Sequence, residues 1–122
     1  MPSKILVIED DKYLRDVLVE KLRKEEFETH EAIDGEAGLA MTKEVKPDLV
    51  VLDIILPLMN GFEYLEQKGK DAAIVKIPVI ILSNLGQRED VERGLKLGAK
   101  DYAVKAHFTP NDLIAKIRKI LT

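Results

Sequence analysis

Short apolar runs alternate along the chain with segments in which apolar residues recur every three or four positions. Four runs, at residues 4–8, 49–52, 79–82 and 102–104, consist mainly of valine, isoleucine and leucine. Apolar runs of this length, bounded by turn residues, predict strands buried on both faces, as in a parallel sheet. Residues 27–33 (FETHEAI) are more polar, and this pattern predicts a strand at the edge of the sheet.

Helical patterns occupy the stretches between the predicted strands. The first helix is expected to begin near Lys12, with Asp11 as its N-cap, and it places Leu14, Leu18 and Leu22 on one face. The other predicted helices follow the turns at residues 34–35 and 60–61, include residues 91–97 and start at Thr109–Pro110. Strands that alternate with helices predict an α/β domain with a parallel sheet and helices on both faces. We expect residues 1–122 to form one domain.

The composition narrows the class of protein. The chain is 46% hydrophobic and 34% charged, which supplies a core and a well-solvated surface. Its net charge of -3 argues against direct binding to nucleic acid or anionic lipid. The absence of cysteine excludes disulfides, thiolate chemistry and zinc–thiolate sites. No signal-peptide or membrane-span pattern is present, so we expect a soluble, cytoplasmic protein without a membrane partner.

Polar side chains follow four of the predicted strands. Glu9 and Asp10 follow the first, Asp53 the third, Ser83 the fourth and Lys105 the fifth. Ligands bind beyond the carboxyl ends of parallel strands, so we expect these residues to meet at one edge of the sheet. Clustered carboxylates repel one another unless a cation or a lysine compensates their charge. The pattern therefore favours a site for Mg²⁺, which prefers oxygen ligands.

Asp53 is the candidate nucleophile. A carboxylate can attack phosphorus and form an acyl phosphate, and it needs no general base because it is ionised at neutral pH. Lys105 and the Ser83 hydroxyl would contact the phosphoryl oxygens, so catalysis would act through positioning and charge neutralisation. Taken singly, the acids are ordinary helix caps and strand ends, and the serine and the lysine are ordinary surface residues. The prediction of a phosphoryl-transfer site depends on all of these residues standing together at the ends of four strands.

The ordered set of motifs resembles the receiver domain of two-component response regulators, of the kind found in chemotaxis regulators. Residues 7–11 (VIEDD), 47–53 (PDLVVLD) and 57–61 (PLMNG) are similar to the family's acid pair, phosphoacceptor segment and following loop. Ser83 and Lys105 stand at the family's hydroxyl and lysine positions. The resemblance extends over nearly the whole chain. It implies a flavodoxin-like, doubly wound sheet of five parallel strands in the order 2-1-3-4-5, with five helices.

The resemblance also implies the chemistry of the site. A sensor histidine kinase or a histidine phosphotransfer protein would donate a phosphoryl group to Asp53, with Mg²⁺ as cofactor. The metal ligands would be Glu9, Asp10, Asp53 and the backbone carbonyl of Ile55. The protein would be a signalling phosphoacceptor with self-catalysed phosphotransfer and dephosphorylation, and not an enzyme acting on a separate substrate.

Ser83 and Tyr102 stand at the positions that the family uses for switching. The resemblance implies that after phosphorylation the hydroxyl would move toward the phosphoryl group and the aromatic side chain would turn inward. The face formed by the fourth helix, the fifth strand and the fifth helix would then change its affinity for a downstream effector or output domain. The same face leaves open a phosphorylation-dependent homodimer. The added charge would act by biasing an element that has two conformations.

Three positions depart from the family pattern. Family members usually have Lys-Pro with a cis peptide bond at the lysine, whereas this chain has Lys105-Ala106. A cis bond before a non-proline residue costs about 2.5–4 kcal/mol, so we expect this bond to be trans. Glu9 and Asn60 each replace an aspartate, and the longer Glu9 side chain would reach the metal through water.

Three other functions share part of this pattern. A haloacid-dehalogenase-type phosphatase needs a second aspartate two residues after the nucleophile, where this chain has Ile55. A flavodoxin-like cofactor binder needs a phosphate loop after the first strand, where the acidic residues 9–11 would repel phosphate. A degenerate receiver that only binds partners fits the Ala106 departure, although the complete set of acids, hydroxyl and amine argues against it.

Overall fold

The computed structural model describes residues 2–122; residue 1, where the predicted domain begins, lies outside that range. The strands are β1 (Lys4–Ile8), β2 (Glu28–Ala32), β3 (Leu49–Leu52), β4 (Val79–Ser83) and β5 (Asp101–Val104). The helices are α1 (Lys12–Lys24), α2 (Gly35–Val45), α3 (Gly61–Gly69), α4 (Arg88–Lys96) and α5 (Pro110–Leu121), with a 3₁₀ turn, η1, at Lys105–His107. The predicted alternation of strands and helices is confirmed.

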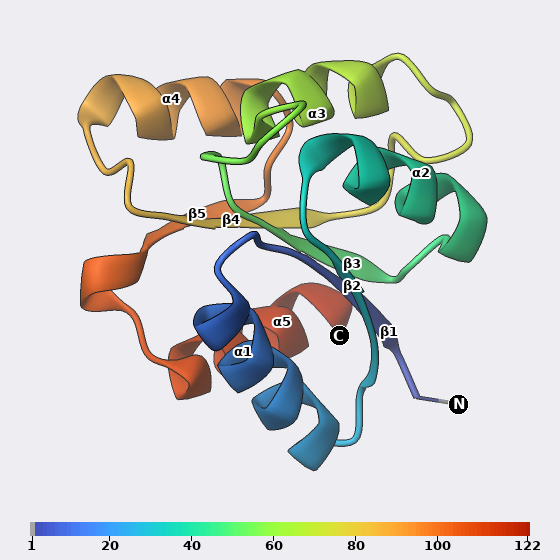
Figure 1. The fold of residues 1–122 in the computed structure, drawn as a ribbon, viewed down its shortest axis with the longest axis vertical. Coiled ribbons are helices and arrows are strands. Elements are labelled where there is room, and N and C mark those ends of the chain that lie inside the picture. The colour runs from blue at the N-terminus through green and yellow to red at the C-terminus, as the bar shows by residue number, and fades with distance from the viewer. Residues whose placement is uncertain (1) are drawn as a thin grey trace.

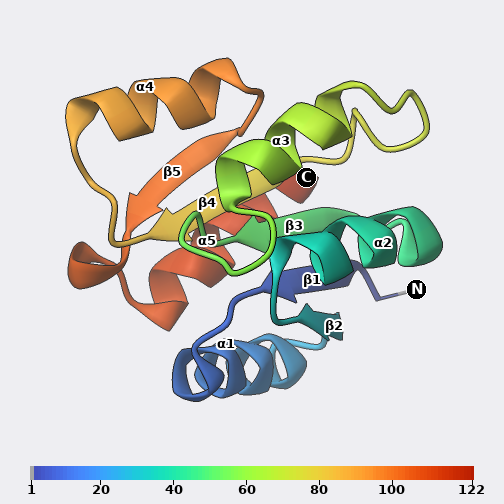
Figure 2. The same cartoon turned by 45° about the horizontal axis from the view of Figure 1, so that its top comes forward.

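The five strands form one parallel sheet in the order β2-β1-β3-β4-β5, as the resemblance implied. Helices α1 and α5 cover one face, and α2, α3 and α4 cover the other (Figures 1 and 2). The predicted edge strand is β2, which is one residue shorter at each end than the expected 27–33. In this topology the carboxyl ends of the central strands open onto the loops that carry the candidate residues.

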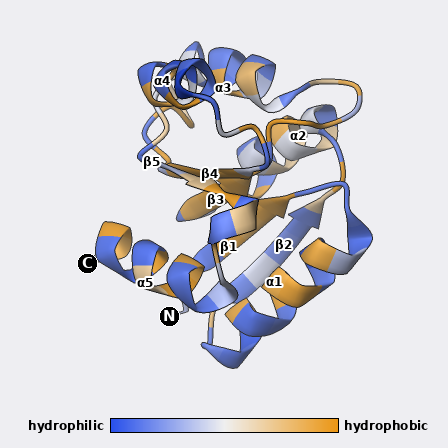
Figure 3. Ribbon diagram, turned by 90° about the vertical axis from the view of Figure 1, so that its left-hand side faces the viewer, coloured by the Kyte–Doolittle hydropathy of each residue, from blue (hydrophilic) through white to orange (hydrophobic). Residues whose placement is uncertain are grey.

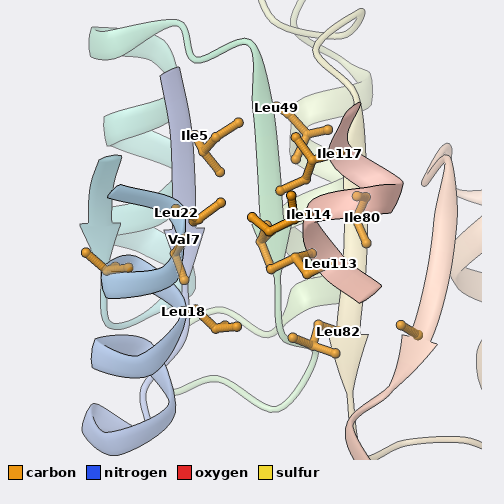
Figure 4. Packing of buried hydrophobic residues seen from close by; sticks show 13 residues of the cluster. Ile5, Val7, Leu18, Leu22, Leu49, Ile80, Leu82, Leu113, Ile114 and Ile117 are labelled. Atoms are coloured by element: carbon orange, nitrogen blue, oxygen red, sulfur yellow. The ribbon is translucent and has the colours of Figure 1, made fainter. Parts of the chain in front are cut away.

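Each central strand contributes alternate side chains to two cores. Ile5 and Val7 pack with α1 and α5 on one face (Figure 4), whereas Leu6 and Ile8 pack toward α3 on the other. All four side chains are fully buried. Full burial of an aliphatic side chain contributes about 1.5–3 kcal/mol, which explains why these strands are apolar at consecutive positions.

The hydropathy of the residues separates the core from the surface. The central strands are hydrophobic, while β2 and the outward faces of the helices are mostly hydrophilic (Figure 3). No helix within residues 2–122 combines the length and the apolar character that crossing a bilayer requires.

Side chains cap three helices that begin near the candidate site, α1, α3 and α5. Asp11 accepts a hydrogen bond from the backbone N–H of Leu14, which confirms it as the N-cap of α1. Thr109 forms a capping box with Asp112 at the start of α5, where Pro110 occupies the first turn. Asn60 caps α3 in the same way. Caps of this kind satisfy backbone N–H groups that have no partner inside the helix, and they fix where each loop ends.

Candidate functional site

The predicted residues gather at the carboxyl edge of the sheet. Glu9 follows β1, Asp53 follows β3, Ser83 ends β4 and Lys105 follows β5. The Lys105 Nζ atom lies 2.8 Å from Oδ2 of Asp53 and 2.8 Å from Oε1 of Glu9. One amine thus joins the ends of three strands that are far apart in the sequence.

Three carboxylates lie together beside this amine. Glu9, Asp10 and Asp53 each offer one oxygen, and these oxygens all lie within 4.8 Å of one another. Glu9 and Asp53 are only 2% and 5% exposed, whereas Asp10 is exposed to solvent. A cluster of carboxylate oxygens open on one side fits a hard divalent cation such as Mg²⁺, which takes one or two carboxylates and keeps several waters.

The pKa values of Glu9 and Lys105 show that the negative charges of the cluster are only partly compensated. Burial raises the pKa of Glu9 to about 7; the hydrogen bond from Lys105 opposes this shift, and the charge of Asp53 adds to it. Burial acts to lower the pKa of Lys105, but its hydrogen bonds with Asp53 and Glu9 raise that pKa above its ordinary value. The lysine therefore stays charged at neutral pH, and it compensates the clustered carboxylates only in part.

The backbone fixes the orientation of Asp53. Its Oδ1 atom accepts hydrogen bonds from the N–H groups of Ile54 at 2.6 Å and Ile55 at 3.3 Å, while Oδ2 faces Lys105. Gly61, the first residue of α3, donates its N–H to the Ile54 carbonyl at 2.8 Å. A Cβ atom on Gly61 would lie 2.5 Å from the Asp53 carbonyl oxygen, so only glycine allows α3 to approach this closely.

Replacement of Gly61 by alanine is expected to displace the Asp53 segment and to lower the free energy of unfolding by about 1–3 kcal/mol, the usual cost of overpacking. Urea unfolding followed by circular dichroism measures the change. Gly69→Ala is the matched control, because a Cβ atom there meets no atom within 4 Å. If Gly61→Ala were as stable as Gly69→Ala, the close approach at Gly61 would not constrain the site.

Ser83 and Tyr102 both bind the loop that follows β4. Ser83 is fully buried, and its Oγ atom accepts a hydrogen bond from the Leu85 N–H at 3.3 Å. The Tyr102 hydroxyl donates to the Leu85 carbonyl oxygen. Burial raises the pKa of Tyr102 to about 12, and the charges of Asp90 and Asp53 contribute to the shift. The hydroxyl therefore stays protonated as a donor, and Leu85 links the two predicted switch residues.

The peptide bond between Lys105 and Ala106 is trans, as predicted. Lys105 begins the turn η1, and its amine reaches the carboxylates from that position. With Ala106 after it and a trans peptide bond, the lysine still contacts Asp53. The Ile55 side chain is exposed, and the metal-binding role of its carbonyl remains a prediction.

The sequence analysis missed Arg15, because a charged residue on a helix usually faces solvent. Its guanidinium group donates to the Glu9 carbonyl at 2.9 Å and pairs with Glu31 on β2. The signal available in the sequence was a basic residue near the start of the helix that follows the acid pair. That signal is weak, because basic residues are common on the solvent faces of helices.

Comparison with known proteins assigns the family. Residues 5–118 match the response regulator receiver domain model. The chain is 34% identical over 118 residues to the DNA-binding dual master transcriptional regulator RpaA of Synechocystis, covering 97% of this chain and 48% of the relative. It is 35% identical over 121 residues to the phosphate regulon transcriptional regulatory protein PhoB of Klebsiella pneumoniae, covering 99% and 52%. The chain thus spans about half the length of these curated relatives.

Solved structures agree with the sequence matches. A CheY-like response regulator receiver domain protein from Methanospirillum hungatei superposes with a TM-score of 0.91 at 30% identity, covering 99% of this chain and 94% of that one. The match to the receiver domain model decides against the two other protein classes, the haloacid-dehalogenase-type phosphatase and the flavodoxin-like cofactor binder. On the strand order, the acid cluster and these similarities, the chain belongs to the response regulator receiver domain family of two-component signalling proteins.

Proposed function

We propose that this chain accepts a phosphoryl group on Asp53 from the phosphohistidine of a sensor histidine kinase or a histidine phosphotransfer protein. The observation that carries the proposal is the contact of one amine, Lys105 Nζ, with both Asp53 and Glu9 at 2.8 Å. A phosphoryl group on Asp53 would lie beside this amine, whose positive charge would compensate the negative charge of one phosphoryl oxygen. The contact also supports phosphoryl acceptance over a degenerate receiver, in which we expect no such arrangement.

In the transfer, one carboxylate oxygen of Asp53 attacks phosphorus while the phosphorus–nitrogen bond to the donor histidine breaks. The electron pair of that bond stays on the histidine nitrogen, and an acyl phosphate forms on Asp53. Lys105 supplies positive charge to one phosphoryl oxygen. The Ser83 hydroxyl accepts from Leu85, so its own hydrogen can be donated to another phosphoryl oxygen.

Glu9, Asp10, Asp53 and the carbonyl of Ile55 would hold Mg²⁺, with Glu9 acting through water. When bound, the cation supplies a divalent charge that neutralises the phosphoryl oxygens. The carboxylates that lie within 4.8 Å of one another are the donor set that supports this assignment.

The contacts at Leu85 suggest how the site changes the surface. A Ser83 hydroxyl drawn toward the phosphoryl group would pull away from the Leu85 N–H, and the Leu85 carbonyl holds Tyr102. The loop and the tyrosine would then move together and change the face formed by α4, β5 and α5. Its partner would be a downstream effector or output domain, or a second copy of this chain.

Incubation with Mg²⁺ and acetyl phosphate is expected to add the mass of one phosphoryl group, because a small acyl phosphate can replace the protein donor at a site that opens to solvent on one side. Intact-protein mass spectrometry measures the addition, and peptide mapping should place it on Asp53. Chelation of Mg²⁺ should prevent the addition, and removal of the donor should let the mass revert as the acyl phosphate hydrolyses. An unchanged mass in the presence of Mg²⁺ would favour the degenerate receiver.

A further inference from the structure

The side chain of Arg15 joins three segments beside the acid cluster. It lies in the first turn of α1, and its side chain is only 12% exposed. Its Nε atom donates to Oε1 of Glu31 on β2 at 3.1 Å. Its Nη1 atom donates to the carbonyl oxygens of Glu9 at 2.9 Å and Asp10 at 3.5 Å. The planar guanidinium group suits this task because its donors point in fixed directions.

These two carbonyls belong to the residues that supply two of the three clustered carboxylates. β1 ends at Ile8, and the Glu9 N–H makes its bond with β2 by donating to the Ala32 carbonyl at 3.0 Å. From Glu9 onward the chain leaves the sheet, so other contacts must orient the peptide planes. A carbonyl held in one direction restricts the ψ angle of its residue and the rotation of the planar peptide group, and this limits the directions in which the side chain can leave the backbone.

We propose that Arg15, anchored on Glu31, is a positioning residue that holds the Glu9–Asp10 backbone so that both carboxylates reach one cation. This inference rests on the proposed Mg²⁺ site. The charge of Arg15 is paired with that of Glu31, so the effect is mainly geometric. Residues outside the ligand shell that orient metal ligands are commonly important for metal affinity.

The first test compares Arg15→Gln with Arg23→Gln by calorimetric titration with Mg²⁺. Arg23 is the matched control: it lies on the same helix, and its Nε atom donates to Oγ1 of Thr29 on the same strand at 2.9 Å. Each variant removes one positive charge and one side-chain bond between α1 and β2. Arg15→Gln is expected to weaken Mg²⁺ binding about tenfold, and Arg23→Gln to leave it unchanged. Equal affinities in the two variants would overturn the inference.

Arg15→Lys separates position from charge. A lysine keeps the positive charge, but it lacks the fork that reaches the Glu31 carboxylate and the two carbonyls together. Weakened binding in this variant supports positioning, and binding as tight as in the wild type would overturn it. The lysine variant also serves as the test if Arg15→Gln does not fold.

A second readout needs no metal. The Asp11 N–H donates to Oε2 of Glu9 at 3.1 Å, so its hydrogen exchange reports whether Glu9 is held in place. Exchange at Asp11 is expected to be faster in Arg15→Gln and unchanged in Arg23→Gln. Exchange as slow as in the wild type would contradict positioning. If the wild type took up no Mg²⁺, the proposed metal site would fail, while the exchange rates would still decide whether Arg15 orients this segment.

Discussion

Replacement of Asp53 by asparagine is expected to abolish phosphoryl uptake from acetyl phosphate. The amide lacks the ionised oxygen that attacks phosphorus, so no acyl phosphate can form at this position. Asparagine has nearly the same shape, and its side-chain oxygen can still accept from Ile54 and Ile55, so we expect the fold to be retained. Intact-protein mass spectrometry after incubation with Mg²⁺ and acetyl phosphate measures the loss, and circular dichroism checks the fold.

Asp16→Asn is the matched control for this variant. Asp16 lies on α1, is exposed and pairs with Lys12, so the control makes the same chemical change outside the cluster. It should take up one phosphoryl group as the wild type does. If the Asp53 variant still gained a phosphoryl group, peptide mapping would show which other side chain accepts it, and the assignment of Asp53 as sole acceptor would be wrong.

Replacement of Glu9 by glutamine is expected to stabilise the metal-free protein at pH 8 by about 1–3 kcal/mol. Burial raises the pKa of this carboxyl from 4.5 to about 7. Each unit of such a shift corresponds to about 1.4 kcal/mol between the two protonation states. Ionised Glu9 therefore destabilises the folded state, and neutral glutamine removes that cost while it keeps the size of the side chain.

The stability that Glu9→Gln adds is expected to increase with pH. Between pH 4.5 and about 7 the folded state holds the Glu9 proton more tightly than the unfolded state does. The stability that this proton contributes is complete below pH 4.5 and is lost as the pH rises through the folded pKa. The stability gap between variant and wild type should therefore be absent near pH 4, grow with pH and level off above about pH 7.

Urea unfolding followed by circular dichroism measures this gap, since the chain contains no tryptophan. Glu20→Gln is the control, because Glu20 is an exposed residue on α1 that pairs with Lys24. Surface substitutions usually change stability by less than about 0.5 kcal/mol. A Glu9 variant no more stable than this control at pH 8 would show that the carboxylate is already compensated without a cation.

The sequence was most informative about the sheet and the candidate residues. Consecutive apolar residues at 5–8 and 49–52 predicted strands buried on both faces, because each face of a central strand must be covered by helices. Polar residues at 28–31 predicted the edge position of β2 for the same reason. The place of Asp53 and Lys105 directly after strands was also readable, since parallel strands end at a common edge.

Amphipathic patterns were a poorer guide to which residues are buried in the helices that flank the site. Leu95 stands among the apolar residues of the predicted fourth helix, yet it is 45% exposed, and Gly94 is the buried residue of α4. Lys68 on α3 is buried and donates to the Val75 carbonyl at 3.0 Å. Residue type alone does not report such positions, because neighbouring elements determine which side of a short helix is covered.

The order of apolar and polar residues by itself determined a five-stranded α/β fold and brought the acids, the hydroxyl and the amine to one edge, because period and burial are local properties of the chain. Only the tertiary structure decided that Lys105 contacts Glu9 and Asp53 together, and that Arg15 holds the Glu9–Asp10 backbone. These contacts depend on distances across the sheet and on side-chain directions at the ends of strands. Neither is encoded in the spacing of residues along the chain.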